Sequence, residues 1–144
     1  MDRVRDNLFF GDIYDAADHE YYRENEIDAV VKLCGINPVP EYPDHVEVVD
    51  MRMPDSEENE LEEVAKAVDL IVKKLERGQT VFVHCAAGQS RSVTVAAAVH
   101  AILEKTGFDQ GLDRIRELRD VQPHPKLQEN GVSIVQVFNG ETDS

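Results

Sequence analysis

Residues 81–92 read VFVHCAAGQSRS, and this stretch decides the fold. Its first part is a run of β-branched and aromatic residues that predicts a buried strand, and its second part is a loop of small residues. The apolar residues that follow Arg91 predict a helix. This order of strand, loop and helix places the loop at the carboxyl end of a central strand in an α/β sheet, where such folds bind ligands.

The loop carries the residues of an anion site with a nucleophile. Cys85 and Arg91 stand six residues apart, so the backbone N–H groups between them can point at one centre and bind an oxyanion. The positive end of the following helix favours the thiolate of Cys85, and Arg91 can grip two phosphoryl oxygens with its planar guanidinium. These features predict phosphoryl transfer to sulfur, with Ser92 placed to donate to the sulfur as it leaves. The predicted phosphate-binding residues are Ala86, Ala87, Gly88, Gln89, Ser90 and Arg91.

The pattern His84-Cys85-x-x-Gly88-x-x-Arg91-Ser92 resembles the active-site signature of the cysteine-dependent protein tyrosine phosphatases. In a chain of this length the dual-specificity branch is the most similar, and residues 8–17 and 123–128 also resemble segments of that family. The resemblance implies hydrolysis of phosphotyrosine and of phosphoserine or phosphothreonine monoesters through a cysteinyl-phosphate intermediate. It also implies that the side chain of His84 orders the loop rather than reacting.

The substrate class follows from what the loop lacks. Residues 86–90 include no lysine or arginine, whereas family members that act on phosphoinositides commonly carry basic residues there. Phosphorylated proteins are therefore the expected substrates. Two other interpretations stay open at this point, namely a rhodanese-like sulfurtransferase, which also uses a cysteine in an anion-binding loop, and a catalytically silent phosphate-binding module.

Phosphate ester cleavage also needs a proton donor for the leaving oxygen, which typically contributes about a hundredfold or more to the rate. Asp55 follows Pro54 on a predicted loop, and its position resembles that of the family's general acid. Asp50, at the end of an apolar strand, is the alternative donor. Asp55 could instead cap the next helix or begin a solvated acidic run.

Cys34 directly follows a predicted strand over residues 29–33. In some family members a cysteine at the matching place lies close to the nucleophile, so the resemblance implies a reversible disulfide between Cys34 and Cys85 that protects the thiolate. A small buried hydrophobe is the other interpretation of Cys34. The histidines show no metal-ligand spacing, so we expect neither a metal nor a cofactor.

The remaining apolar pattern predicts alternating strands and helices. Strands are expected over residues 8–10, 29–33, 46–49 and 80–83, and helices around 16–22, 61–75, 90–105, 109–119 and 125–138. Gly78 is the expected left-handed end of the second helix, and Asp109 the expected N-cap of the fourth. We therefore predict a single α/β domain over residues 1–144, with a central, mostly parallel sheet flanked by helices and a frayed tail at 139–144.

The chain is strongly acidic. It has 144 residues and a net charge of −14, with 29 acidic residues against 15 lysines and arginines, which disfavours nucleic acid and anionic membranes as partners. The absence of a long apolar stretch or signal peptide, together with only two cysteines, predicts a cytoplasmic protein, and we expect a monomer. Such a surface suits a salt-rich cytoplasm, as in halophilic archaea, although ordinary acidic proteins also carry solvated charged helix faces.

Overall fold

A mixed sheet forms the centre of the computed structural model, which describes residues 2–35, 41–53, 61–86 and 89–140. Within these residues five strands lie in the order β1-β2-β5-β3-β4, and all pairs are parallel except β1 with β2. The strands are β1 (Asp2–Arg5), β2 (Leu8–Gly11), β3 (Ala29–Lys32), β4 (Glu47–Asp50) and β5 (Val81–His84). The helices are α1 (Ile13–Ala16), α2 (His19–Glu24), α3 (Leu61–Glu76), α4 (Arg91–Glu104), α5 (Phe108–Leu118) and α6 (Pro125–Phe138).

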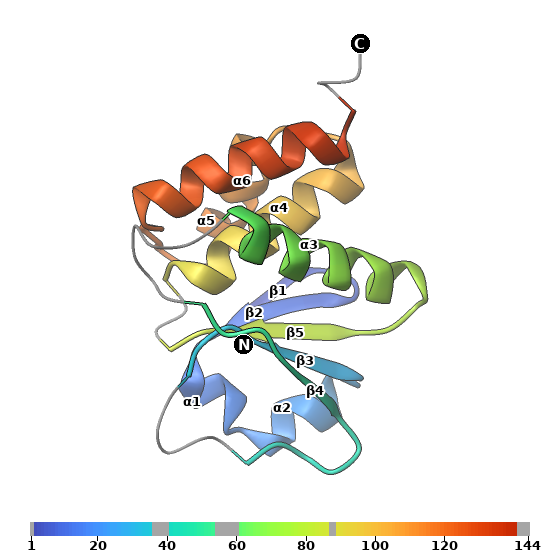
Figure 1. The fold of residues 1–144 in the computed structure, drawn as a ribbon. Coiled ribbons are helices and arrows are strands. Elements are labelled where there is room, and N and C mark those ends of the chain that lie inside the picture. The colour runs from blue at the N-terminus through green and yellow to red at the C-terminus, as the bar shows by residue number, and fades with distance from the viewer. Residues whose placement is uncertain (1, 36–40, 54–60, 87–88, 141–144) are drawn as a thin grey trace.

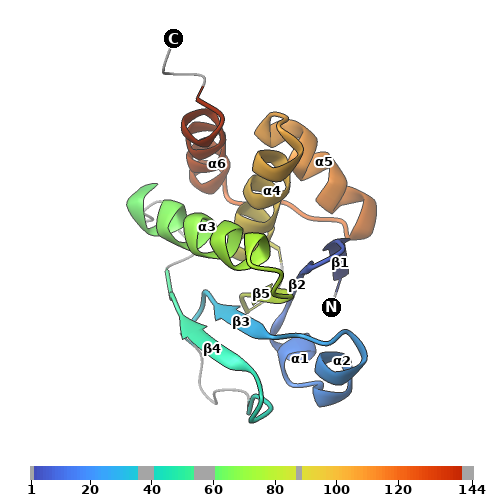
Figure 2. The ribbon, with the colours of Figure 1, turned by 90° about the vertical axis from the view of Figure 1, so that its right-hand side faces the viewer.

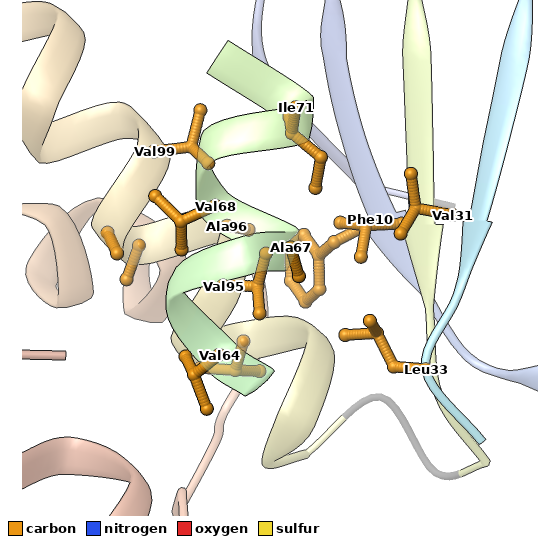
Figure 3. Close-up of a cluster of buried hydrophobic side chains, with 14 of the residues drawn as sticks. Phe10, Val31, Leu33, Val64, Ala67, Val68, Ile71, Val95, Ala96 and Val99 are labelled. Carbon is orange, nitrogen blue, oxygen red and sulfur yellow. The ribbon is translucent and has the colours of Figure 1, made fainter. Parts of the chain in front are cut away.

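Helices cover the sheet on both faces, with α3 to α6 on one side and the short α1 and α2 on the other (Figures 1 and 2). This arrangement follows from the sequence, because side chains alternate along a strand and the central strands β2, β3 and β5 are mostly apolar and buried at every position. Phe10 of β2 packs in the larger apolar cluster, and its neighbour Phe9 packs in the smaller one on the opposite face. Figure 3 shows the larger cluster, in which Phe10, Val31 and Leu33 from the sheet side lie against Val64, Ala67, Val68 and Ile71 of α3 and Val95, Ala96 and Val99 of α4.

Helix α4 is the buried axis of the larger layer. It packs against β2, β5 and the helices α3, α5 and α6, and its small side chains allow these neighbours to approach closely. At Gly111 of α5 an added Cβ would lie only 2.2 Å from the carbonyl oxygen of Ala97. The backbones of α5 and α4 are therefore in direct contact at this point. The tight packing holds the first turn of α4 in place at the end of β5.

The structure confirms the predicted α/β sheet with the loop between a central strand and a helix, and it differs from the prediction in detail. The edge strand β1 was not predicted, and the single helix expected around residues 16–22 is divided into α1 and α2. The division occurs because the side chain of Asp18 accepts from the amide of Glu20 and starts a second helix. Gly78 has the predicted positive φ of 84°.

Asp109 was wrongly predicted as the N-cap of the fourth helix. The N-cap of α5 is Gly107, and the helix begins at Phe108, which is 3% exposed. Burial of this aromatic ring therefore places the start of the helix earlier than a capping carboxylate at residue 109 would. Asp109 instead lies in the first turn, where a negative charge still interacts favourably with the helix dipole.

Candidate active site

The sulfur of Cys85 lies at the junction of β5 and α4. Its side chain is only 2% exposed, and its Sγ lies 3.2 Å from the Oγ of Ser92 and 3.5 Å from the backbone nitrogen of Ser92. Ser92 is in the first turn of α4, so both of its donors come from the positive end of a helix. A hydroxyl and an N–H group beside the same sulfur stabilise a negative charge on it.

Contacts from distant segments hold the loop after Cys85. The carbonyl oxygen of Ala86 accepts from the amide of Ile13 at 3.1 Å, and the amide of Cys85 donates to the carbonyl oxygen of Gly11 at 3.4 Å. At the other end of the loop, the Oγ of Ser90 accepts from the amide of His124 at 2.7 Å. The two described ends of the loop are therefore held by β2 and α1 on one side and by the start of α6 on the other.

Arg91 begins α4 and reaches toward the segment after β4. Its Nη1 donates to the carbonyl oxygen of Met53 at 3.2 Å, and its Nε is buried without a hydrogen-bond partner among the described residues. Arg91 also lines a surface hollow together with Gly35, Arg52 and Met53. The guanidinium therefore keeps donor capacity for an oxyanion, in the position where the sequence predicts one.

His84 is fully buried, and both of its ring nitrogens have partners. Its Nδ1 lies 3.4 Å from the carbonyl oxygen of Cys85, and its Nε2 lies 2.7 Å from the hydroxyl of Tyr42. Burial is the main cause that lowers the pKa of His84 to about 4, so the ring is neutral at pH 7. A carbonyl oxygen only accepts, so the proton of the neutral ring is on Nδ1, and the hydroxyl of Tyr42 donates to Nε2.

The ends of β3 and β4 bring together charged side chains beside the hollow. The Nε and Nη2 of Arg52 donate to the carboxylate of Asp50, at 2.8 Å for the shortest bond, and the Nζ of Lys32 lies 3.6 Å from the same carboxylate. Hydrogen bonding from Arg52 is the main cause that lowers the pKa of Asp50 below its ordinary value. A carboxyl group that is held ionised in this way is a poor proton donor at neutral pH.

Cys34 lies at the end of β3, next to the strand that leads to Cys85. The amide of Leu33 donates to the carbonyl oxygen of His84 at 3.0 Å, and both cysteines are buried, free thiols in the same apolar cluster. Burial is the main cause that raises the pKa of the Cys34 thiol, and the charge of Cys85 raises it further. Cys34 is therefore a neutral thiol at pH 7.

An ion-pair cluster around Arg119 supports the segment that contacts the loop. The guanidinium of Arg119, after α5, lies 2.8 Å from the carboxylate of Asp2 and 3.2 Å from that of Asp15. Asp15 and Asp12 cap α1 reciprocally, and α1 carries the amide that holds Ala86. The cluster thus connects the C-terminal half of the chain to the segment that fixes the loop.

The structure brings together several residues that the sequence predicted for the site. These are Cys34, Cys85, Ala86, Gln89, Ser90, Arg91 and Ser92, at the carboxyl ends of β3 and β5. The predicted residues Asp55, Ala87 and Gly88 lie outside the described residues. Elsewhere in the described chain, no group of three histidine, cysteine, aspartate or glutamate side chains could hold a metal ion.

Sequence reasoning missed Tyr42, Arg52 and Met53 as parts of the site. Each arrives from a segment far from the signature, and no motif in its own neighbourhood indicates the contact that it makes. Gly11 was part of the prediction only as a member of residues 8–17, the segment that resembles the phosphatase family. Its role is visible in space, where its carbonyl oxygen also lies 3.4 Å from the Oγ of Ser92.

Comparisons with known proteins agree with this geometry. A family model described as "Dual specificity phosphatase, catalytic domain" matches residues 8–131. Dual specificity protein phosphatase 1B of Arabidopsis thaliana is 27% identical over 131 residues, which cover 87% of this chain and 75% of the relative. Dual specificity protein phosphatase 22-A of Danio rerio is 26% identical over 119 residues, with 83% and 57% covered. The crystal structure of human DUSP28 is similar in fold, with a TM-score of 0.87, 18% identity and 99% of each chain covered.

Proposed function

The chain belongs to the dual specificity phosphatase catalytic-domain family and is a protein phosphatase, and on this premise we propose the roles of its own residues. The thiolate of Cys85 attacks the phosphorus of a phosphorylated side chain, a sulfur–phosphorus bond forms, and the bond to the leaving oxygen breaks. Arg91 and the loop N–H groups hold the phosphoryl oxygens throughout. The contact between the Cys85 sulfur and the two donors of Ser92 is the observation that carries this proposal.

We assign the second step to water and Ser92. Water attacks the phosphorus of the cysteinyl phosphate, and the sulfur–phosphorus bond breaks. Inorganic phosphate is released, and Cys85 returns to the thiolate. A hydrogen bond from the Oγ of Ser92, 3.2 Å from the sulfur, stabilises the charge that returns to Cys85. His84 takes no part in proton transfer in this scheme because its ring is buried and both nitrogens are occupied.

Asp55 is our proposed general acid, and it becomes the base for the attacking water. The surroundings of the rival carboxylate support this choice, because Asp50 is paired with Arg52 and Lys32 and is held ionised. The sulfurtransferase and the silent binding module are not favoured, since the family match extends over residues 8–131.

Two leaving groups of different quality test these assignments in one experiment. Cys85→Ser abolishes turnover of both p-nitrophenyl phosphate and phenyl phosphate. Asp55→Asn lowers kcat for phenyl phosphate by about a hundredfold and for p-nitrophenyl phosphate by much less, because the phenolate is the poorer leaving group and needs the proton more. Asp50→Asn is the matched control, and it leaves the ratio between the two substrates unchanged.

The assignment of Asp55 fails if Asp50→Asn, and not Asp55→Asn, shows the greater loss with phenyl phosphate. Retention of turnover in Cys85→Ser would contradict the whole scheme. Thiosulfate turnover by a folded protein that releases no phosphate would instead support a sulfurtransferase, and phosphopeptide binding without phosphate release would support a binding module.

We also propose that Cys34 is a redox partner of Cys85. Hydrogen peroxide oxidises the Cys85 thiolate to a sulfenic acid, and the Cys34 thiol condenses with it to give a disulfide and water. The buried position of both sulfurs in one cluster, at the ends of adjacent strands, supports this pairing.

The cellular setting that we propose is a reducing cytoplasm, with the protein acting as a monomer on phosphorylated proteins and not on nucleic acid. Two free cysteines and a net charge of −14 support this assignment. No helix in the described part of the chain is long and apolar enough to cross a bilayer.

A further inference from the structure

A second guanidinium lies beside the proposed phosphate site. Arg52, just after β4, lines the same surface hollow as Arg91, and Gly35 and Met53 complete the lining. Two different segments therefore each contribute one cation to the hollow. Arg52 comes from the segment just after β4, and Arg91 from the start of α4. Only Arg91 has a role in the chemistry proposed above.

Arg52 keeps part of its hydrogen-bonding capacity. Its Nε and Nη2 donate to Asp50, whereas its Nη1 makes no hydrogen bond to a described residue. The side chain is 61% exposed. An added Cβ at Gly35 would lie 3.1 Å from this Nη1, so the absence of a side chain there leaves the guanidinium room beside the hollow.

The described side chains that line the hollow carry a charge opposite in sign to the net charge of the chain. Among the described residues, the charged side chains that line the hollow are Arg52 and Arg91, and Asp50 pairs with Arg52 and with the buried Lys32. The chain as a whole carries a net charge of −14. A positive group of side chains in such an anionic protein attracts anions to one place.

We propose that Arg52 forms a second anion subsite, which binds the carboxylate or phosphate of a residue that flanks the target phosphoresidue in a protein substrate. This rests on the proposed function, because the first phosphate occupies the loop beside Arg91. A planar guanidinium with a free edge suits either oxyanion, and its exposure makes the contact available to a bound peptide. Arg52 is thus a specificity-determining residue, and not only the partner of Asp50.

Phosphopeptides that differ at one flanking position test the subsite. All carry a central phosphotyrosine, and the neighbour is glutamate, glutamine or a non-hydrolysable phosphonate analogue of phosphothreonine. The wild type prefers glutamate over glutamine in kcat/KM by about three- to fivefold, as an exposed charge pair allows. Comparison of the glutamate and phosphonate peptides shows which oxyanion Arg52 prefers.

Three variants isolate the contribution of Arg52. Arg52→Gln reduces the preference for the anionic peptides to about one, and Arg52→Lys, which keeps the charge, retains part of it. Arg77→Gln makes the same charge change at an exposed arginine just before β5, at the amino end of the strands, and keeps the full preference. Thermal unfolding of each variant shows that it is folded.

The same peptides bound to the Cys85→Ser protein separate the subsite from the catalytic proposal. A preference in Kd that is lost on adding Arg52→Gln supports the subsite even if the wild type releases no phosphate, an outcome that would overturn only the proposed function. Equal preferences in the Arg52→Gln and Arg77→Gln proteins overturn the subsite while leaving the phosphatase assignment intact. No preference in the wild type also overturns it.

Discussion

His84 connects the sheet to the loop through a single ring. Its Nδ1–H points to the carbonyl oxygen of Cys85, and its Nε2 accepts from Tyr42. The ring also stacks on Phe82 with a centroid distance of 5.6 Å, so its orientation is fixed by packing as well as by hydrogen bonds. A charged ring at this place could no longer accept from Tyr42, because both nitrogens would then be donors and the Tyr42 hydroxyl would have to turn and accept instead.

The buried ring makes stability depend on pH. The unfolded chain binds a proton on this imidazole near pH 6.5, whereas in the folded state the pKa is about 4. Between these values the unfolded state holds more protons, so the stabilisation is complete above about pH 6.5 and is lost as the pH falls toward about 4. We expect urea unfolding to show a loss from this group of about 3 kcal/mol over that interval.

His84→Gln is the comparison for this titration. The variant is less stable than the wild type at pH 7, and the difference between the two free energies of unfolding shrinks as the pH falls from 6.5 toward 4. Parallel curves for the two proteins would show that His84 does not titrate with a lowered pKa.

Cys34 permits a separate test of the redox proposal. We expect treatment of the wild type with hydrogen peroxide to give a Cys34–Cys85 linked peptide in nonreducing mass spectrometry, and dithiothreitol to restore phosphatase activity. In Cys34→Ala the same treatment leads to irreversible loss, because the sulfenic acid of Cys85 is oxidised further. Equal recovery of both proteins, without a linked peptide, would contradict the pairing.

The residues of the signature could be predicted because they are contiguous. Cys85, Arg91 and Ser92 belong to one short stretch of sequence, which runs from the end of a strand of clear pattern into the first turn of a helix of clear pattern. Tyr42 and Arg52 could not be predicted in the same way. Their roles depend on which strands lie side by side, and the hydroxyl of Tyr42 reaches His84 across 42 positions of sequence.

At the scale of elements, the buried strands were the most predictable part of the fold. Strands β3 and β5 are buried at every position, and each appears in sequence as three consecutive apolar residues, followed by Lys32 in β3 and by His84 in β5. Strand β1 gives no such pattern, because among its four residues only Val4 is buried. Strand β4 is largely exposed and begins one residue later than predicted. Val46, which suggested the earlier start, is buried but lies outside the strand.

The contact between α4 and α5 provides a test at this scale. Gly111→Ala destabilises the protein by about 1–3 kcal/mol, since the new methyl group meets the carbonyl oxygen of Ala97 and backbone cannot move aside easily. Helix propensity alone predicts the opposite sign, a gain of about 1 kcal/mol. Urea unfolding distinguishes the two.

Asp113→Ala is the control for this substitution, because Asp113 is exposed on the same helix. It changes the free energy of unfolding by no more than about 0.5 kcal/mol. Stabilisation by Gly111→Ala would mean that the two helices are not in close backbone contact.

The whole molecule is negatively charged, and so are the phosphorylated substrates that it binds. Its net charge of −14 repels phosphorylated substrates at long range, whereas the cationic side chains at the site attract them at short range. The Debye length falls from about 10 Å at 0.1 M salt to about 3 Å at 1 M, so salt removes the long-range repulsion more completely than the contact at the site.

We therefore expect both stability and kcat/KM for an anionic substrate to rise as potassium chloride is increased from 0.1 M to 2 M. The mutual repulsion of the acidic side chains decreases, and the substrate approaches more easily. Sucrose at the same osmotic strength serves as the uncharged control. A fall in both quantities with salt would contradict adaptation to a salt-rich cytoplasm and would indicate an ordinary acidic protein.

The most direct test of the account is a pre-steady-state measurement on Ser92→Ala with p-nitrophenyl phosphate. Loss of the hydroxyl beside the sulfur slows the second step more than the first, so we predict a burst of p-nitrophenolate close to one per active site. The phosphate should then be found on Cys85 by mass spectrometry of the quenched protein. Phosphate on a residue other than Cys85 would contradict Cys85 as the nucleophile, and linear release of p-nitrophenolate with no trapped phosphate would contradict the role of Ser92 in the second step.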